Sequence, residues 1–143
     1  MIRILILGGG FGGVETYRRL HTLTHHRDDI GITLINRTNY FYFTPMLHEV
    51  ATGSVGRDHM VEPLREIVTC CTNHFVEAEI ERVDLEKETV ITNHGTFEYD
   101  YLVIALGSLA NFAGVNGAEQ CAWGFRTMQD AIALRNRVVC LFE

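Results

Sequence analysis

A glycine-rich segment separates two hydrophobic patterns near the start of the chain: five of the six residues from Gly8 to Gly13 are glycine. Before it, Ile2–Leu7 is an aliphatic run, which is typical of a strand buried on both faces of a parallel sheet. After it, apolar residues recur every three positions, at Val14, Tyr17, Leu20 and Leu23. The second pattern indicates an amphipathic helix. The sequence therefore predicts a strand, a tight glycine turn and a helix in succession.

Gly8, Gly10 and Gly13 match the pattern G-x-G-x-x-G at the junction of this strand and helix. In such a junction the first glycine permits a tight turn, the second lets the backbone approach a diphosphate, and the third lets the helix pack closely on the strand. The helix N-terminus also presents N–H groups and a partial positive charge to an anion. The segment predicts a dinucleotide site; the alternative is a tight turn that binds nothing.

A second aliphatic strand, Ile30–Ile35, completes a β-α-β unit. Sites of this kind usually have an acidic residue after the second strand that bonds the ribose hydroxyls. This chain has Asn36 there, followed by Arg37. Asparagine accepts a hydrogen bond without bringing a charge. Arg37 has two open interpretations: a solvated arginine at a strand end, or a group that stacks on adenine or meets a 2′-phosphate. The second leaves NADP open as the ligand.

The rest of the chain combines further core elements with a region of strand periodicity. The aromatic-rich connection from Arg37 to Gly56 is long for a compact domain, and such loops are usually functional. A period of two over Glu79–Tyr101, with a turn at Asn93–Gly95, predicts a small antiparallel meander. The other expected elements are a helical turn at Pro45–Thr52, a helix at Met60–Val68, strands at His74–Ala78 and Tyr101–Ala105, and a helix from Met128 to Phe142 capped by Thr127.

Composition bounds the partners and the compartment. The 143 residues are 47% hydrophobic, which is enough for one globular domain with a core. A net charge of −6 argues against a nucleic-acid partner, because proteins that bind nucleic acid normally carry a basic face. The apolar run at the start is too short for a membrane span and has no cleavage site. We therefore expect this run to be a strand rather than a signal segment; the cytoplasmic compartment is expected from the cysteine usage described next.

The cysteines and histidines do not have the spacing of a metal site, so no metal is expected. Among the four cysteines, Cys70 and Cys71 are adjacent and no pair has C-x-x-C spacing. Two reduced thiols are expected there, with a vicinal disulfide as the alternative. This cysteine usage indicates a reducing compartment. His25 and His26 are interpreted as a solvated pair at a helix C-terminus rather than as metal ligands.

Four segments together resemble the N-terminal part of flavoproteins of the pyridine nucleotide-disulphide oxidoreductase superfamily, and most closely the type II NADH:quinone oxidoreductases. The segments are GGGFGG, ITLINRTNYFYFTPMLHEVATG, YDYLVIALGS and TMQDAIALRNRV. The resemblance runs over nearly the whole chain. It implies an α/β, Rossmann-like FAD-binding domain with a parallel sheet, helices on both faces and a small antiparallel β-meander as a crossover.

The resemblance also implies where FAD would bind. The glycine loop would surround the diphosphate, and residues after the second and third strands would lie by the adenosine, with Ala78 approaching the adenine through its backbone. Thr44 and Pro45 would approach the flavin end, and the loop after the strand at Tyr101–Ala105 would close over the dinucleotide. The residues implied are Gly8, Gly9, Gly10, Phe11, Gly12, Gly13, Asn36, Arg37, Thr44, Pro45, Ala78, Ala105, Leu106 and Gly107.

Enzymes of this family pass a hydride from NADH to flavin N5 and then two electrons to a membrane quinone. The resemblance therefore implies a flavin-dependent NADH dehydrogenase of the respiratory chain. Because the cofactor does the chemistry, no catalytic residue is assigned. Disulfide reductases of the superfamily carry a cysteine pair after the second strand; TPMLHEVATG has none, which excludes that branch. Two alternatives remain: a sulfide:quinone or other FAD-dependent oxidoreductase, with Cys121 the lone candidate to attack sulfide, and a non-catalytic dinucleotide-binding module.

Relative to this family, residues 1–143 correspond to the first part of an FAD-binding domain. The NADH-binding domain, the closing flavin motif and the C-terminal segments for quinone and membrane contact are expected in a full-length enzyme and are absent from this chain. A truncated chain of this kind is expected to be inactive alone. The full-length protein is expected to lie on the inner face of the cell membrane as a peripheral protein and to form a homodimer.

Overall fold

The computed structural model describes residues 1–70 and 72–143, which divide into two compact units. Unit 1 comprises Met1–Phe41 and Glu62–Gly107, and unit 2 comprises Tyr42–Val61 and Ser108–Glu143. The chain passes from unit 1 to unit 2 within β3 (Tyr40–Tyr42), returns within β4 (Val61–Pro63), which pairs with β3 as a two-stranded sheet, and enters unit 2 again after Gly107. Within the described residues, every helix is too short or too polar to span a membrane.

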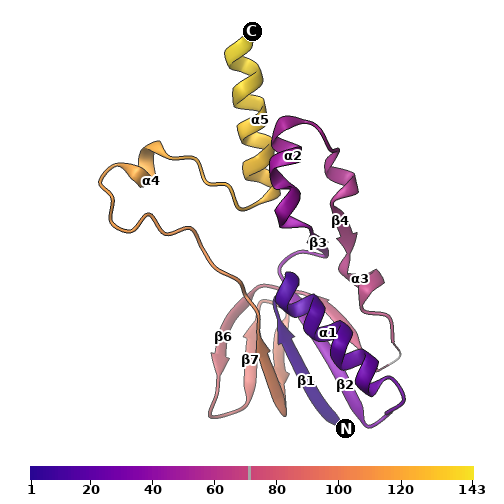
Figure 1. The fold of residues 1–143 in the computed structure, drawn as a ribbon. Helices are drawn as coiled ribbons and strands as arrows, with labels where there is room; N and C mark the ends of the chain where they lie inside the picture. The colour runs from indigo at the N-terminus through magenta and orange to yellow at the C-terminus, as the bar shows by residue number, and fades with distance from the viewer. Residues whose placement is uncertain (71) are drawn as a thin grey trace. The chain divides into compact units, whose positions relative to one another are not determined.

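Unit 1 is built on a parallel sheet of four strands in the order β5-β2-β1-β9 (Figure 1). The strands are β1 (Ile2–Leu7), β2 (Ile30–Asn36), β5 (His74–Glu77) and β9 (Tyr101–Ile104). Ile4 of β1 pairs with Ile32 on one side and with Tyr101 on the other. Because all four strands run in one direction, their carboxyl ends meet at a single edge, where open α/β sheets bind ligands.

Two helices cover one face of this sheet. The first is α1 (Phe11–Thr24), and the second is the short α3 (Leu64–Ile67). Val14 and Tyr17 of α1 and Leu64 of α3 pack on alternate side chains of the strands, which include Ile6, Ile32 and Leu34. The amphipathic pattern of α1 is thus confirmed over its first turns. Leu23, expected on the same apolar side, lies in the last turn of the helix, outside the buried cluster, and is 69% exposed.

An antiparallel meander covers the other face. It consists of β6 (Ile80–Asp84), β7 (Thr89–Thr92) and β8 (Gly95–Glu98), and it forms the crossover from β5 to β9 (Figure 1). Val90 and Tyr99 pack against Leu5, Leu7 and Ile35 of the sheet. The α/β class, the parallel sheet and the meander crossover are confirmed. One detail differs from the expectation of helices on both faces: within the described part of unit 1, the second face is covered by the meander.

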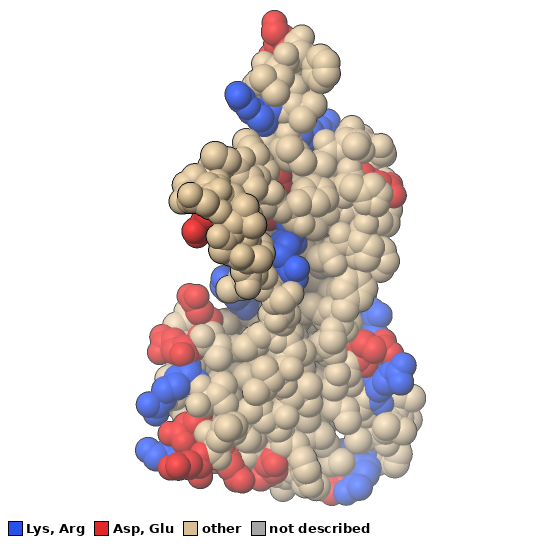
Figure 2. Space-filling model, turned by 60° about the vertical axis from the view of Figure 1, so that its left-hand side comes forward, with Lys and Arg blue, Asp and Glu red and all other residues tan. Residues whose placement is uncertain are grey.

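Unit 2 contains short helical segments and the longer helix α5 around a smaller core. They are η1 (Thr44–Met46), α2 (Leu47–Thr52), η2 (Arg57–His59), α4 (Ala118–Cys121) and α5 (Met128–Phe142). Leu47 and Val50 of α2 and Met128 and Ala131 of α5 form its buried cluster together with Met60. The last turns of α5 are exposed, and Figure 2 shows few charged side chains on the visible face of this helix, at the top of the view.

The helix expected at Met60–Val68 is wrong in its first half. Residues Val61–Pro63 form the strand β4, and the helix α3 begins only at Leu64. Pro63 explains the difference, because a proline disfavours the helical conformation of the residue before it and donates no backbone hydrogen bond. Proline is instead accepted as the residue immediately before a helix, which is the position Pro63 occupies with an extended backbone.

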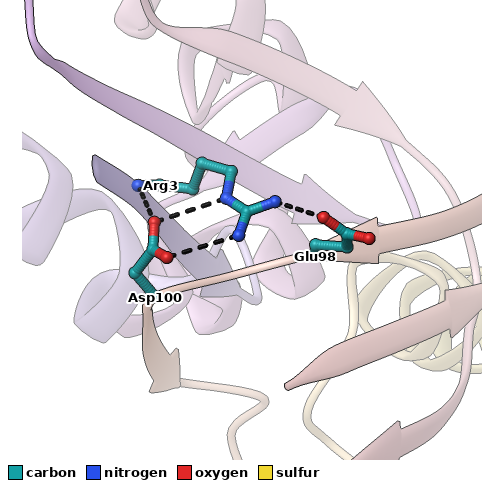
Figure 3. A network of polar contacts seen from close by, with 3 residues as sticks. All are labelled: Arg3, Glu98 and Asp100. Carbon is teal, nitrogen blue, oxygen red and sulfur yellow. Dashed lines mark hydrogen bonds and ion pairs between the residues drawn. The ribbon is translucent and has the colours of Figure 1, made fainter. Parts of the chain in front are cut away.

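A charged group links β1 to the meander (Figure 3). The Arg3 guanidinium donates to Asp100 at 3.3 Å through Nε and through Nη2, and also donates to Glu98 of β8. The Arg3 backbone N–H donates to Asp100 Oδ2 at 2.6 Å. These hydrogen bonds favour the ionised carboxylate, first the one from the Arg3 side chain and then the one from its backbone, so the pKa of Asp100 is lowered.

Candidate functional site: the glycine loop at the sheet edge

The glycine loop lies at the carboxyl edge of the sheet, directly after β1. Its first residue, Gly8, donates its N–H to Ile35 O of β2 at 2.8 Å. On the opposite side of β1, the N–H of Ala105 donates to Leu7 O at 2.8 Å. The loop is therefore held between the strands that flank β1 and leads straight into α1.

Two of the three motif glycines are required by the chain's own packing. Gly8 has φ +104°, a conformation that side chains rarely adopt, and a Cβ there would collide with the backbone carbonyl of Ala105. A Cβ at Gly13 would collide with the carbonyl oxygen of Gly8, because α1 approaches the end of β1 closely. These positions correspond to the tight turn and to the close packing of helix on strand that the sequence predicts.

Gly10 differs from both. Its φ of −84° and ψ of −167° are accessible to any residue, and apart from Gly10 itself and its two neighbours in the chain, no heavy atom of the described residues lies within 4 Å of the position that a Cβ would take. Neither strain nor a clash within the chain accounts for glycine here. The residue is exposed, so its bare backbone can be approached from outside. This is the property that the second glycine of a dinucleotide loop supplies.

The N-terminus of α1 faces the same space. Gly10 is its N-cap and offers no side-chain acceptor, and the first turn contains no acidic residue. The hydrogen bond from Val14 N to Gly10 O, at 2.9 Å, closes the first helical turn. The N–H groups of a first turn precede the intrahelical acceptors and carry the positive end of the helix dipole. The donor set of this loop therefore fits a diphosphate.

Asn36, the last residue of β2, lies against the loop. Its Oδ1 accepts a hydrogen bond from Gly9 N at 2.8 Å, and its Nδ2 donates to Thr38 O at 2.9 Å. A Cβ on Gly9 would come within 2.9 Å of Asn36 Cγ and 2.6 Å of Leu64 Cδ1. The structure thus places Asn36 against the glycine loop, where its amide forms hydrogen bonds within the chain, and its predicted place by the adenosine stays a prediction.

Arg37 and Ala78, predicted to lie by the adenosine, line one hollow of about 460 Å³ beside the ends of β2 and β5. Ala78 donates its N–H to Asn36 O at 2.9 Å, which fixes its backbone there. The hollow has further lining residues that sequence reasoning missed: Arg65, Glu77, Glu79, Asn93 and His94. The turn at Asn93–Gly95 was recognisable in the sequence, but only the fold places its side chains beside Arg37.

The segment after β9 lies partly beside the loop. A Cβ on Gly12 would stand 3.5 Å from the Cβ of Ala105, and Gly107 has φ +77°. Leu106 is 57% exposed. Ala105 is therefore next to the glycine loop, while the closing of this segment over a dinucleotide stays a prediction. Thr44 and Pro45 belong to η1 in unit 2, so their assignment to the flavin end stays a prediction.

The histidines and cysteines singled out in the sequence do not form a second functional site within the described residues. His25 and His26 are exposed at the end of α1, with ring centroids 5.3 Å apart, and the described residues contain no group of three potential metal ligands. Cys121 is exposed at the end of α4, so it is not a packing residue. The expectation of two reduced thiols at Cys70 and Cys71, like the alternative of a vicinal disulfide, involves residue 71, which lies outside the described residues.

Comparison with known proteins gives one family match and similar structures. The model of the family described as pyridine nucleotide-disulphide oxidoreductase matches residues 2–139. A type II NADH:quinone oxidoreductase of Staphylococcus haemolyticus is 31% identical over 136 residues, which are 95% of this chain and 34% of that protein. The chain therefore spans about a third of the length of such curated relatives.

Two solved structures resemble the fold closely. The sulfide:quinone oxidoreductase of Aquifex aeolicus has a TM-score of 0.86 and 31% identity, covering 99% of this chain and 32% of that one. The NDH2 of Plasmodium falciparum, solved in complex with NADH, has a TM-score of 0.77 and 27% identity, covering 94% of this chain and 28% of that one. Both similarities run over nearly all of this chain, as the sequence resemblance implied.

Proposed function

Because this chain belongs to the pyridine nucleotide-disulphide oxidoreductase family, we propose that it is the FAD-binding N-terminal part of a flavin-dependent NADH dehydrogenase. Residues 1–143 would form the first part of the FAD-binding domain. The support is the family match together with the similarity to type II NADH:quinone oxidoreductases over 95% of the chain.

One observation supports FAD binding most directly: the empty surroundings of Gly10. Gly8 and Gly13 are explained by collisions within the chain, whereas a Cβ at Gly10 would come within 4 Å of none of the described residues other than its two chain neighbours. A glycine that the fold does not require is explained by a ligand that approaches the backbone. The first-turn N–H groups of α1 at the same place favour a ligand with a negative diphosphate.

The residues proposed to hold FAD follow from this placement. The loop Gly8–Gly13, with Gly9, Phe11 and Gly12 between the motif positions, would hold the diphosphate. Arg37 and Ala78 would bound the adenosine in their shared hollow, and Asn36 would stand beside it. Thr44 and Pro45 would approach the flavin, and Ala105, Leu106 and Gly107 would close the loop over the dinucleotide. Bound FAD would supply two-electron transfer, which the protein orients.

The activity of the whole enzyme is proposed from its relatives. NADH would be the donor and a quinone the acceptor, as the names of the type II relatives state for those proteins. The full-length protein would be a homodimer that lies peripherally on the inner face of the cell membrane. Its quinone and membrane contacts would lie in parts of the relatives that this chain does not span.

A second candidate function is sulfide:quinone oxidoreduction. It is favoured by the TM-score of 0.86 to the Aquifex aeolicus enzyme and by the exposure of Cys121, which leaves the thiol accessible. The donor distinguishes the two functions. In the full-length enzyme, sulfide-dependent bleaching of the flavin that Cys121→Ser abolishes would support the second candidate. NADH-dependent bleaching that Cys121→Ser leaves unchanged would support the first.

The test of FAD binding is Gly10→Ala. Because a methyl group there meets no residue beyond the two chain neighbours of Gly10, the variant should unfold in urea close to the parent's midpoint, with at most the small cost of alanine at an N-cap, while its affinity for FAD falls by at least about tenfold. The matched control is Gly56→Ala: Gly56 has φ −69°, and its Cβ would make only an ordinary contact, 3.5 Å from His59. Fluorescence titration with FAD measures both. Unchanged FAD affinity in Gly10→Ala, or no FAD binding by the parent chain, would contradict the proposal.

A further inference from the structure

Asn36 occupies the place where a dinucleotide site usually has an acidic, ribose-binding residue, yet its side chain is engaged by the chain itself. Oδ1 accepts from Gly9 N at 2.8 Å. Nδ2 donates to the carbonyl oxygen of Thr38 at 2.9 Å and contacts Thr38 Oγ1 at 3.2 Å. The amide thus bridges the glycine loop and the segment that follows β2.

The chemistry of the two partners requires an amide at this position. The N–H of Gly9 can only donate and the carbonyl oxygen of Thr38 can only accept, so the orientation of the Asn36 amide is fixed by its neighbours. A carboxylate would satisfy Gly9 but would set a lone pair against the Thr38 carbonyl. An acidic residue is therefore disfavoured at position 36 by contacts within this chain.

The hydrogen bond from Gly9 N to Asn36 Oδ1 holds the part of the loop that lies next to the proposed point of approach for a ligand. Gly9 is buried, and a Cβ on it would press into Asn36 and into Leu64 Cδ1, at 2.9 and 2.6 Å. A buried N–H left without an acceptor costs free energy, so Asn36 favours one orientation of the peptide at Gly9. The next residue is Gly10, whose exposed backbone is the proposed point of approach for a diphosphate.

We infer that Asn36 is a positioning residue: it fixes the glycine loop through Gly9 and does not act as the ribose-binding residue. The inference rests on the proposed function in that the loop is taken to bind the diphosphate of a dinucleotide. Under this inference Asn36 does not contact the ligand; it shapes the loop that contacts the ligand. Recognition of the ribose then passes to other residues of the hollow lined by Arg37 and Ala78.

The decisive experiment compares Asn36→Ala with the parent chain on two ligands, ADP and 2′,3′-dideoxy-ADP, which lacks both ribose hydroxyls. If Asn36 acts through Gly9, the variant loses about tenfold in affinity for both ligands, because the loop is loosened whatever the sugar carries. Titration calorimetry measures the four dissociation constants. A loss seen with ADP that disappears with 2′,3′-dideoxy-ADP would show a direct ribose contact and overturn the inference.

A second measurement needs no ligand. Amide hydrogen exchange of Gly9 should become faster in Asn36→Ala, which removes the acceptor. It should stay close to the parent in Asn36→Asp, which keeps an oxygen facing Gly9, provided that variant is folded. The control Thr38→Val removes Oγ1 but keeps the carbonyl that Nδ2 contacts at 2.9 Å, so Gly9 should remain protected. Exchange at Gly9 unaffected by Asn36→Ala would overturn the inference. Failure of the parent chain to bind ADP or FAD would instead count against the proposed function.

Discussion

Unit 1 and unit 2 differ in how completely they bury their apolar side chains. Among the described residues, the largest fully buried side chains all belong to unit 1; they are Tyr17, Ile6, Leu7, Ile32, Leu34, Ile35, Leu64 and Val90. The buried cluster of unit 2 is smaller, and large apolar side chains of the same unit are exposed, among them Leu109 at 93% and Phe142 at 89%. Unit 1 therefore has a core on both faces of its sheet, and unit 2 has a smaller core.

This difference separates the proposed cofactor site into two parts. The residues proposed for the diphosphate and the adenosine stand on loops that leave the closely packed parallel sheet of unit 1. The residues proposed for the flavin end, Thr44 and Pro45, stand on a single turn of unit 2. Sites on rigid elements keep their geometry better than sites on loops with little packing. The nucleotide half of the site should therefore be the better preorganised half.

The largest effect is expected from Gly13→Ala, which attacks the packing of unit 1. The new Cβ would collide with the backbone carbonyl of Gly8, and neither backbone can move away without separating α1 from β1. We expect a loss of about 4 kcal/mol or more in the free energy of unfolding, as for other severe core defects. Urea unfolding followed by circular dichroism measures it. A midpoint equal to that of Gly10→Ala would show that α1 is not closely held.

A matched leucine pair tests the comparison between the units directly. Leu34 is 0% exposed in unit 1 and Leu47 is 3% exposed in unit 2, so both substitutions to alanine remove a buried side chain. Such substitutions cost about 2–5 kcal/mol, depending on how far the surroundings collapse into the cavity. We expect Leu34→Ala near the upper end and Leu47→Ala near the lower end, because the smaller cluster of unit 2 can relax. Equal losses in urea unfolding would contradict the difference in rigidity.

The same difference explains how far the sequence could predict the structure. In unit 1 the strands β1, β2, β5 and β9 agree with the predicted runs to within one residue at each end, because continuous aliphatic runs between turn residues are a strong signal. The periodicity of the meander was equally clear. The helix predicted from Met60 is wrong up to Pro63, because proline disfavours the helical conformation of the residue before it and this effect outweighs the apolar spacing.

The candidate site was predictable only where a short sequence motif encodes it. The glycine motif and its place between strand and helix followed from spacing alone. The hydrogen bond from Gly9 to Asn36 joins residues far apart in the sequence and depends on the register of β2 beside β1, which no local pattern encodes. Arg65 and His94 reach the hollow from α3 and from the meander turn, so their convergence on Arg37 required the fold.

A smaller effect is expected at the start of α5, where a cap holds the longest helix of unit 2. Thr127 Oγ1 accepts from Asp130 N at 3.1 Å, and Asp130 Oδ2 accepts from Thr127 N at 2.8 Å. Thr127→Ala should cost about 1 kcal/mol, and Thr127→Ser, which keeps the acceptor, should cost much less. Urea unfolding measures both variants. A loss from Thr127→Ser as large as that from Thr127→Ala would show that the hydroxyl acceptor is not the source.

The smallest effect is expected from the exposed charges that join β1 to the meander in unit 1. Hydrogen bonds from the Arg3 side chain and backbone lower the pKa of Asp100 from its ordinary value of 3.8. A carboxyl with a lowered pKa in the folded state contributes stability above its ordinary pKa, and this contribution is lost as the pH falls through the lowered value.

Asp100→Asn should therefore lower the urea midpoint slightly at pH 6, and the difference from the parent should shrink as the pH falls below 3.8. Asp28→Asn makes the same charge change at another exposed aspartate and serves as the control. Because ion pairs at an exposed surface contribute little, a large effect of Asp100→Asn would mean that unit 1 depends on this contact rather than on the apolar cluster of Val90 and Tyr99. The account of unit 1 as a unit held by its two-sided core would then fail.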